Sequence, residues 1–395
     1  MIAIVSDLHM TDRERGAAIA AQLLWLLVEE LDRLRSRYKR LELVLLGDVI
    51  DFLRSEKWDA DKTRPWRGLR GGFEQFSGSP QEATGLRIVQ DVCRRYEDFH
   101  NRLTRLKASG EVHVRYVAGN HDYITRLSRE LREVLCEFLF LDEDPARPFP
   151  IEYAQPQVGL VALHGSQFDP MNCHREMEGI WPIGDAIVTD IVNRFEQRGC
   201  DDLHLRPGEP LCEAVQEVDN VVPVHHVPCY VHWLAESGLF GDRAETLKDV
   251  WRGVVDDFAR FAHGEGLDYP QGLRLALEAS KAFPAPKLAN LVSHLFARAD
   301  FESRANEMAI REDRPRIIVF GHTHDPGIRP LPKIGSHERY YVNTGSWRRV
   351  RVCPGLAQAV QFASLDIAGM FLVFEEADDA PPGGRFHLIS RWHLT

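Results

Sequence analysis

Seven side chains of kinds that bind metal ions stand just after short apolar stretches of the sequence. They offer carboxylate, amide and imidazole donors and no sulfur. They are Asp7, His9, Asp48, Asn120, His164, His322 and His324. Two divalent ions need about eight to twelve coordination positions, which a bridging carboxylate, several imidazoles, an amide oxygen and waters can fill. The set is sufficient for a dinuclear metal site, a kind of site that turns a bound water into hydroxide near neutral pH.

Asp48 follows the clearest of these apolar stretches. Residues 41–46 are almost wholly apolar and are followed by Gly47, Asp48 and, three residues later, Asp51. A buried strand fixes the backbone and a glycine at its end opens it, which is a common way to hold a carboxylate in a site. We therefore expect Asp48 to lie between the two metal ions.

Four further apolar stretches end in the same way. Side chains alternate along a strand and the turn after it, so Asp7 and His9 can lie on one side with Leu8 on the other. A single Asp-x-His or His-x-His pair occurs by chance, whereas five such strand ends in one chain are not expected to. The four stretches are residues 1–6 before Asp7 and His9, 112–118 before Asn120, 158–163 before His164, and 316–320 before His322 and His324.

Helical periodicity separates these stretches in the first part of the chain. Apolar residues recur at helical spacing over about residues 13–40, 88–107 and 125–140. Strand, helix and strand in succession predict βαβ units and an α/β fold. Antiparallel strands are predicted near the C-terminus, over residues 359–365, 370–375 and 386–392.

The middle of the chain, residues 171–314, departs from this alternation. Over residues 247–261 one broad apolar stripe recurs at i, i+3, i+4, i+7 and i+8, which predicts an amphipathic helix. The histidines here lack ligand spacing and are interpreted as hydrogen-bonded or surface residues, with the neighbours His225 and His226 the first pair to examine. We interpret the segment as a helical insertion or cap.

Taken in order, five motifs resemble those of the calcineurin-like metallophosphoesterases: Asp-x-His, Gly-Asp-x-x-Asp, Gly-Asn-His-Asp, His-Gly and Gly-His-x-His. The resemblance covers the chain to about Asp169 and resumes after about Pro315. It implies an α/β (α+β) fold, a four-layer α/β/β/α sandwich with a two-metal site at the strand ends. The core would consist of residues 1–170 and 315–395, with a helical insertion over residues 171–314.

The resemblance also implies a role for each residue of the site. One ion would be bound by Asp7, His9 and His324, the other by Asn120, His164 and His322, and both by Asp48. His121 and Asp51 occupy the positions of the family's catalytic histidine and its acidic partner. Such a histidine can protonate the leaving oxygen or stabilise transition-state charge, and it needs an acceptor that orients it. Asp51 is the expected acceptor, and Asp122 is the competing candidate.

The activity implied is that of a metal-dependent phosphoric ester hydrolase. A metal-bridging hydroxide would attack a phosphomonoester or phosphodiester, with His121 as proton donor. Nitrogen and oxygen donors without thiolate suit Mn2+, Fe or Zn2+, and we expect two ions of Mn2+ with the other metals as alternatives. The expected partner is a phosphoester small molecule or a nucleotide.

Three alternatives stay open. The strand ends look like those of the bacterial group that includes the UDP-2,3-diacylglucosamine hydrolase, a pyrophosphate hydrolase, although that group has an arginine in place of His121 and lacks so long an insertion. A histidine at position 121 is a feature that the chain shares with the general phosphoesterases and with the nuclease subunit of double-strand-break repair complexes. The second alternative is therefore a nuclease that acts on DNA ends or single strands. A non-catalytic metal-bound scaffold is the third, although no ligand or proton donor is missing.

Charge bears on the nuclease alternative. A formal net charge of -11 argues against a broad nucleic-acid-binding face. Residues 52–85, rich in Gly, Pro and charge, predict a long loop that is either functional or a solvated surface. Basic residues of this loop and after Trp347 favour a nucleic-acid or other anionic substrate. They are Arg54, Lys57, Lys62, Arg64, Arg67, Arg70, Arg348, Arg349 and Arg351.

The remaining composition points to an ordinary globular protein. Seven scattered cysteines without a CxxC pair indicate neither a disulfide framework nor a thiolate zinc site. The longest apolar stretch, near residues 17–28, is too short for a membrane span. The chain enters a strand at once, without the features of a signal peptide, so we expect a cytoplasmic protein. Nothing in the sequence indicates an oligomeric state.

Overall fold

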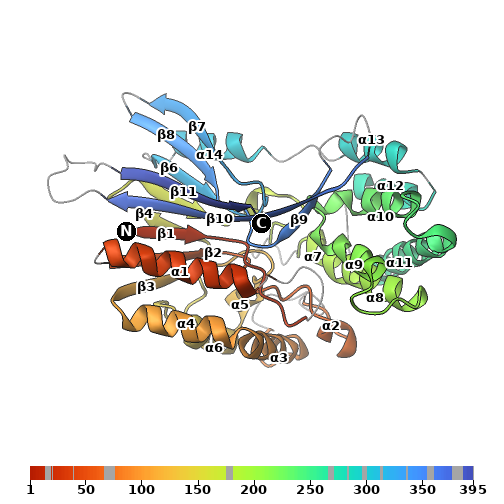
Figure 1. Ribbon diagram of the computed structural model, residues 1–395, viewed down its shortest axis with the longest axis horizontal. Helices are drawn as coiled ribbons and strands as arrows, with labels where there is room; N and C mark the ends of the chain where they lie inside the picture. The colour runs from red at the N-terminus through yellow and green to blue at the C-terminus, as the bar shows by residue number, and fades with distance from the viewer. Residues whose placement is uncertain are drawn as a thin grey trace.

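Two β-sheets stack face to face at the centre of the molecule, and helices cover their outer faces (Figure 1). The predicted four-layer α/β/β/α sandwich is therefore confirmed. The computed structural model describes residues 1–394 except 14–18, 20, 39, 66–75, 175–180, 266–270, 283, 296–299, 312–314, 335–336, 354–359 and 376–385.

The first sheet has six strands and is built around three parallel ones. Its order is β11-β10-β1-β2-β3, and β9 pairs with β10 off this path. β1, β2 and β3 run parallel, so their carboxyl ends lie at one edge of the sheet. The strands are β1 (Ile2–Val5), β2 (Arg40–Leu46), β3 (Glu111–Val117), β9 (Arg349–Val352), β10 (Ala363–Glu375) and β11 (Phe386–Leu394).

The second sheet has five strands in the order β4-β5-β6-β8-β7, of which β5, β6 and β8 are parallel. The strands are β4 (Glu152–Gln155), β5 (Leu160–Leu163), β6 (Ile317–Phe320), β7 (Gly327–Ile334) and β8 (His337–Asn343). The sequence did not predict β7, because Pro330 and Pro332 interrupt its pattern. β7 lies at the edge of the sheet, where proline is tolerated.

Side chains of the parallel strands alternate between the two faces of each sheet. Ala3 and Val5 pack against the outer helices, whereas Ile4 packs between the sheets with Val44 and Ile317, and all five are fully buried. Burial on both faces makes these strands continuous apolar stretches in the sequence. This is why their positions could be predicted.

Helices α1, α3, α4 and α6 cover the first sheet, and α14 covers the second, on opposite sides of the sandwich in Figure 1. Their bounds are α1 (Ala21–Arg37), α3 (Pro80–Arg95), α4 (Glu97–Ala108), α6 (Arg129–Leu139) and α14 (Phe301–Arg311). Ser79 and Ser128 cap α3 and α6, because each side chain accepts a hydrogen bond from the backbone N–H three residues later.

Three predicted segments differ from the structure. The helix expected over about residues 125–140 is α5 (Ile124–Leu127) followed by α6, because the backbone of Ser128 between them is extended. The loop expected over residues 52–85 contains α2 (Lys57–Ala60) and ends at Ser79, because the serine cap and Pro80 in the first helical position start α3 there. The single helix expected over residues 88–107 is two helices, which meet at Tyr96.

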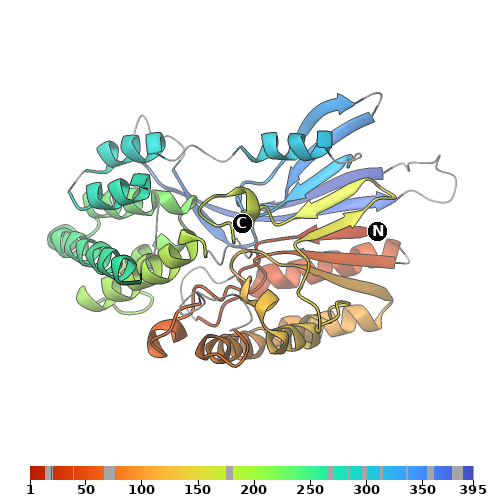
Figure 2. The same ribbon diagram turned by 180° about the vertical axis from the view of Figure 1, so that it is seen from behind.

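Helices α7 to α13 form a group at the end of the sandwich to which β1 points (Figures 1 and 2). They have a hydrophobic core of their own, in which Phe195, Tyr230 and Trp251 are buried. The predicted apolar stripe lies on α11 and faces this core. The helices are α7 (Ile183–Ile187), α8 (Asn193–Asp202), α9 (Pro210–Gln216), α10 (Val227–Glu236), α11 (Ala244–Glu265), α12 (Gln271–Ala279) and α13 (Ala285–Leu295). Over the described ranges, no helix combines the length and apolarity needed to cross a bilayer.

Candidate metal centre

The structure brings all seven predicted ligands together at the carboxyl ends of β1, β2, β3, β5 and β6. Their side chains form two groups that lie against each other, and each group could hold a metal ion. Asp7, His9 and His324 make up the first group. Asp48, His164 and His322 make up the second, and Asn120 joins it through a contact with His164.

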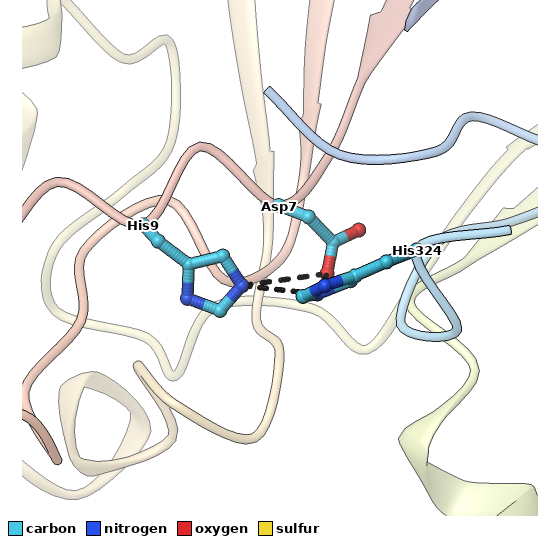
Figure 3. A group of neighbouring side chains, drawn as sticks. All are labelled: Asp7, His9 and His324. Carbon is cyan, nitrogen blue, oxygen red and sulfur yellow. Dashed lines mark hydrogen bonds and ion pairs between the residues drawn. The ribbon is translucent and has the colours of Figure 1, made fainter. Parts of the chain in front are cut away.

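In the first group three ligand atoms converge (Figure 3). The Nε2 atoms of His9 and His324 lie 3.2 Å apart, and Asp7 Oδ1 lies 3.1 Å from His324 Nε2 and 3.8 Å from His9 Nε2. Asp7 Oδ2 is turned the other way, where it accepts hydrogen bonds from the Ser6 hydroxyl and from the backbone N–H of His322. Oδ1 has no hydrogen-bond partner among the described residues.

In the second group acceptor atoms also face one another. His164 Nε2 lies 3.2 Å from Asn120 Oδ1 and 3.3 Å from Asp48 Oδ2. Asp48 Oδ1 accepts the backbone N–H of His121 at 2.9 Å. The free oxygen of Asp48, Oδ2, also lies 3.9 Å from His9 Nε2 of the first group. Asp48 therefore lies between the two groups.

Hydrogen bonds behind the imidazoles fix which nitrogen faces the centre. His9 Nδ1 lies 2.8 Å from Asp51 Oδ2, and His164 Nδ1 lies 3.0 Å from the Leu46 carbonyl oxygen. His322 Nε2 lies 3.0 Å from Asp169 Oδ2. Because these nitrogens donate outward, the opposite nitrogen of each ring presents a lone pair inward. Converging lone pairs and carboxylate oxygens repel one another unless a cation lies between them, so the donor set fits divalent metal ions.

Charges within the centre shift the pKa values of its members. Burial disfavours the charge of Asp48, but His164 and His121 hold the pKa of its carboxyl below its usual range. Burial alone would lower the pKa of His164, yet Asp48 raises it to about 10. The pKa of His324 falls to about 3, because burial outweighs the attraction of Asp7. The carboxylates thus create a negative potential that attracts cations.

The backbone of the centre is strained. Eight non-glycine residues of the described chain have positive φ, and five of them are predicted metal ligands: Asp7, His9, Asp48, His322 and His324. Such left-handed conformations are uncommon for residues with a Cβ and persist only where the surrounding structure holds them. Their concentration here marks a functional site.

Glycines allow the strand ends to approach one another. Gly47 has φ of +79°, and a Cβ built on it would lie 2.5 Å from His164 Nδ1. A Cβ on Gly119 would overlap the carboxylate of Asp48. The glycines of the Gly-Asp and Gly-Asn-His-Asp motifs are therefore needed for the contact between strands that forms the centre.

His121 lies beside the centre, and its ring contacts Asp51. His121 Nδ1 is 2.8 Å from Asp51 Oδ1, and Nε2 is 3.9 Å from Asp48 Oδ2. Burial lowers the pKa of His121, but the carboxylates of Asp51 and Asp48 more than compensate and raise it. Asp122, the competing acceptor, accepts instead from the backbone N–H groups of Val49 and Gly119 and from the Tyr116 hydroxyl. Asp122 thus ties strand ends together and does not contact the His121 ring.

Most basic residues of the 52–85 segment that the structure describes are engaged in ion pairs. Arg54 pairs with Asp51 and Asp219, and Arg64 pairs with Asp190. Lys57 pairs with Asp12 and Asp91. Arg67 and Arg70 lie outside the described residues. The sequence predicted that this segment is either a solvated loop or a loop that binds an anionic substrate. Neither prediction fits Arg54 or Arg64, because both side chains are buried.

The arginines after Trp347 also contact the helical group. Arg349 and Arg351 pair with Glu217, and Arg348 donates to the carbonyl oxygen of Asp219. Both partners belong to the 3-10 helix η5 (Glu217–Asn220). These three arginines therefore do not form a free basic patch.

Sequence reasoning missed Asp169 and Asp219 as neighbours of the centre. Asp169 lies five residues after His164, in the irregular segment after β5, and its position at a strand end was a usable signal. Asp219 lies in the helical segment and belongs to no motif, so only the fold reveals its contact with Arg54.

A family model described as calcineurin-like phosphoesterase matches residues 1–326, which is most of the chain and includes every predicted metal ligand. No curated protein matches the sequence.

Proposed function

Because the chain belongs to the calcineurin-like phosphoesterase family, we propose that it is a hydrolase of phosphoric esters that depends on two divalent metal ions. The observation that carries this proposal is the pair of ligand groups that meet at Asp48. The substrate would be a phosphoester small molecule or a nucleotide, in which a phosphomonoester or phosphodiester bond is cleaved.

The contacts support an assignment of each ligand to one of the two ions. Asp7, His9 and His324 would hold one ion, Asn120, His164 and His322 the other, and Asp48 both. The position of Asp48 Oδ2, 3.3 Å from His164 Nε2 and 3.9 Å from His9 Nε2, supports the bridging role. We propose Mn2+, with Fe or Zn2+ as alternatives, because all donors are nitrogen or oxygen.

When bound, such a pair of ions supplies hydroxide near neutral pH and neutralises charge on the phosphoryl oxygens. His121 would donate a proton to the leaving oxygen or stabilise the charge that develops there. Its Nδ1 contact with Asp51 leaves Nε2 turned toward the centre. Asp51 would keep the ring in this orientation, and it also orients His9.

We propose that residues 171–314 form an insertion that limits access to the centre, with residues 1–170 and 315–395 as the core. Asp219, Asp190 and Glu196 pair with arginines of the core near the strand ends, which supports a position over the centre. α14 is the exception within this range, because it packs on β7 and β8.

Hydrolysis of model substrates tests the proposal. Metal-depleted protein is reconstituted with Mn2+ and assayed on p-nitrophenyl phosphate, bis(p-nitrophenyl) phosphate, mononucleotides, cyclic nucleotides and single-stranded DNA. We expect hydrolysis of at least one small phosphoester, loss of activity with a chelator and recovery with Mn2+. If protein with two bound ions hydrolyses none of these substrates, the chain is a scaffold and the proposal is wrong.

A further inference from the structure

Arg348 is held beside the metal centre by the loop that follows β8. The backbone N–H of Trp347 and the hydroxyl of Ser346 both donate to the Asp7 carbonyl oxygen, each at 3.2 Å. Arg348 thus follows directly on two residues that are anchored to a predicted ligand of the first group. Its side chain is not required for this anchoring.

The guanidinium of Arg348 is buried but only partly hydrogen-bonded. The residue is 3% exposed, and Nη2 donates to the Asp219 carbonyl oxygen at 3.1 Å. Nε and Nη1 have no hydrogen-bond partner within the described part of the chain. Buried arginine N–H groups normally have acceptors, so these two are available to bind an anionic ligand.

A second buried guanidinium lies beside it. Arg54 Nη2 donates to the same Asp219 carbonyl oxygen at 3.3 Å, and Arg54 Nη1 lies 2.5 Å from Asp51 Oδ2. The Asp219 carboxylate is itself paired with Arg54. Burial lowers the pKa of Arg348 to about 10, and the charge of Arg54 lowers it too, while Asp219, Asp51 and Asp7 act in the opposite direction. Arg54 is thus paired with two carboxylates and lies 3.0 Å from His121 Nδ1, whereas Arg348 makes no ion pair within the described ranges.

We propose that Arg348 binds a non-bridging phosphoryl oxygen of the substrate and makes the protein select phosphomonoesters over phosphodiesters, an inference that rests on the proposed function. A monoester dianion has three non-bridging oxygens, so one would be left for Arg348 if the other two faced the metal ions. A guanidinium N–H donates a charge-assisted hydrogen bond to such an oxygen. In a diester the corresponding oxygen carries a second ester substituent and offers no full negative charge.

The test compares Arg348→Met with a matched control, Arg349→Met. Arg349 is the next residue, is half exposed and pairs with Glu217, away from the centre. Each Mn2+-loaded protein is assayed for kcat/KM on p-nitrophenyl phosphate and on bis(p-nitrophenyl) phosphate, and its metal content is measured. Arg348→Met is expected to lose about 10- to 100-fold on the monoester and less than about 3-fold on the diester. Arg349→Met is expected to change neither value more than about twofold.

Binding of inorganic phosphate gives a readout that needs no turnover. Isothermal titration of the Mn2+-loaded proteins is expected to show affinity at least about tenfold weaker for Arg348→Met and unchanged for Arg349→Met. If wild type with two ions bound hydrolyses neither ester nor any other substrate of the panel named above, the proposed function fails, while phosphate binding still tests Arg348 separately.

Other outcomes overturn the inference. An equal loss on both esters with full metal content would contradict the proposed selection of monoesters by Arg348. Unchanged phosphate affinity in Arg348→Met would exclude contact with the phosphoryl group. If Arg348→Met does not fold, Arg348→Lys replaces it, because lysine keeps the charge but not the planar fork. A lower monoester-to-diester ratio in Arg348→Lys supports the proposal, and an unchanged ratio contradicts it.

Discussion

The two carboxylate oxygens of Asp48 have different surroundings. Oδ1 is held by the backbone N–H of His121, and Oδ2 faces ligand nitrogens of both groups. Removal of this side chain takes away the one atom that the groups share. We expect Asp48→Ala to bind fewer than two metal ions per chain and to lose its activity, as measured by inductively coupled plasma mass spectrometry and phosphoesterase assay. Two ions still bound to this variant would contradict the bridging role.

Substitution of His121 is expected to affect turnover and not metal content. Since its proposed role is proton transfer, His121→Ala should keep both metal ions and lose about 100- to 10,000-fold in kcat. His9, Asp48 and His121 also lie close enough together to hold one metal ion, which would make His121 a metal ligand. Metal analysis distinguishes the two roles, because loss of an ion from His121→Ala would identify it as a ligand. Asp51→Asn is expected to lose less bound metal than Asp48→Ala.

At the residue scale, the structure brings together all seven candidate ligands that the sequence predicted, because each one follows a buried strand inside a short motif. The acceptors behind the imidazoles were harder to foresee. Asp169 and the Leu46 carbonyl oxygen are joined to their histidines only by the fold. Backbone carbonyls carry no sequence signal at all.

At the scale of elements, the centre depends on how closely the strand ends can approach. A Cβ built on Gly321, at the end of β6, would lie 2.5 Å from Ser6 Oγ and 2.6 Å from Asp7 Oδ2. Ser6 and Asp7 are fully buried and cannot move away freely. Gly321→Ala should therefore displace the Asp7 carboxylate, destabilise the fold by about 1–3 kcal/mol and weaken metal binding.

Gly264→Ala is the control for that substitution. Gly264 lies near the end of α11, and a Cβ on it would meet nothing within 4 Å. Alanine in place of a helical glycine is expected to leave stability unchanged or raise it by about 0.4–1 kcal/mol. Urea unfolding and Mn2+ titration of both variants test the comparison. Equal behaviour of the two would show that the strand ends tolerate a side chain at Gly321.

Elements differed in how well the sequence predicted them. The parallel strands were found because they are buried on both faces, and α11 because its apolar stripe is broad. β7 was missed because an edge strand accommodates proline, and the break at Tyr96 was missed because the apolar pattern continues across it. The place of the helical group over the strand ends depends on contacts between distant segments, which no local pattern encodes.

At the scale of the whole molecule, charge joins the helical group to the sandwich. Among the residues that the structure describes, three buried or largely buried ion pairs connect them, and in each the cation comes from the sandwich side and the carboxylate from the helical side. They are Arg13 with Glu196, Arg54 with Asp219, and Arg64 with Asp190. Buried pairs of this kind specify how two parts meet more than they stabilise the fold.

Glu196 makes this contact sensitive to pH. Burial and the charges of Asp219 and Glu56 together raise the pKa of Glu196 to about 7, despite the attraction of Arg13. An unfolded glutamate has a pKa of about 4.3. The folded state therefore binds more protons between these values, and the free energy of unfolding falls as pH rises through this window.

Glu196→Gln, which cannot titrate, should lack this dependence. We expect the free energy of unfolding of wild type minus that of the variant to fall by about 2 kcal/mol from pH 5 to pH 8. Urea unfolding at several pH values measures it, and contributions from groups that both proteins share cancel. A difference that stays constant or grows with pH would show that Glu196 is charged throughout.

The positive φ angles of five candidate ligands can help to identify similar metal centres in other proteins. Asp7, His9, Asp48, His322 and His324 are separated by as many as 317 positions in the chain, yet all share a sign of φ that carboxylate and imidazole residues seldom adopt. Torsion angles are independent of side-chain placement and of motif spelling. A set of Asp and His residues with positive φ that gather at one edge of stacked sheets is thus a geometric signature, by which related centres can be found in chains whose motifs have diverged.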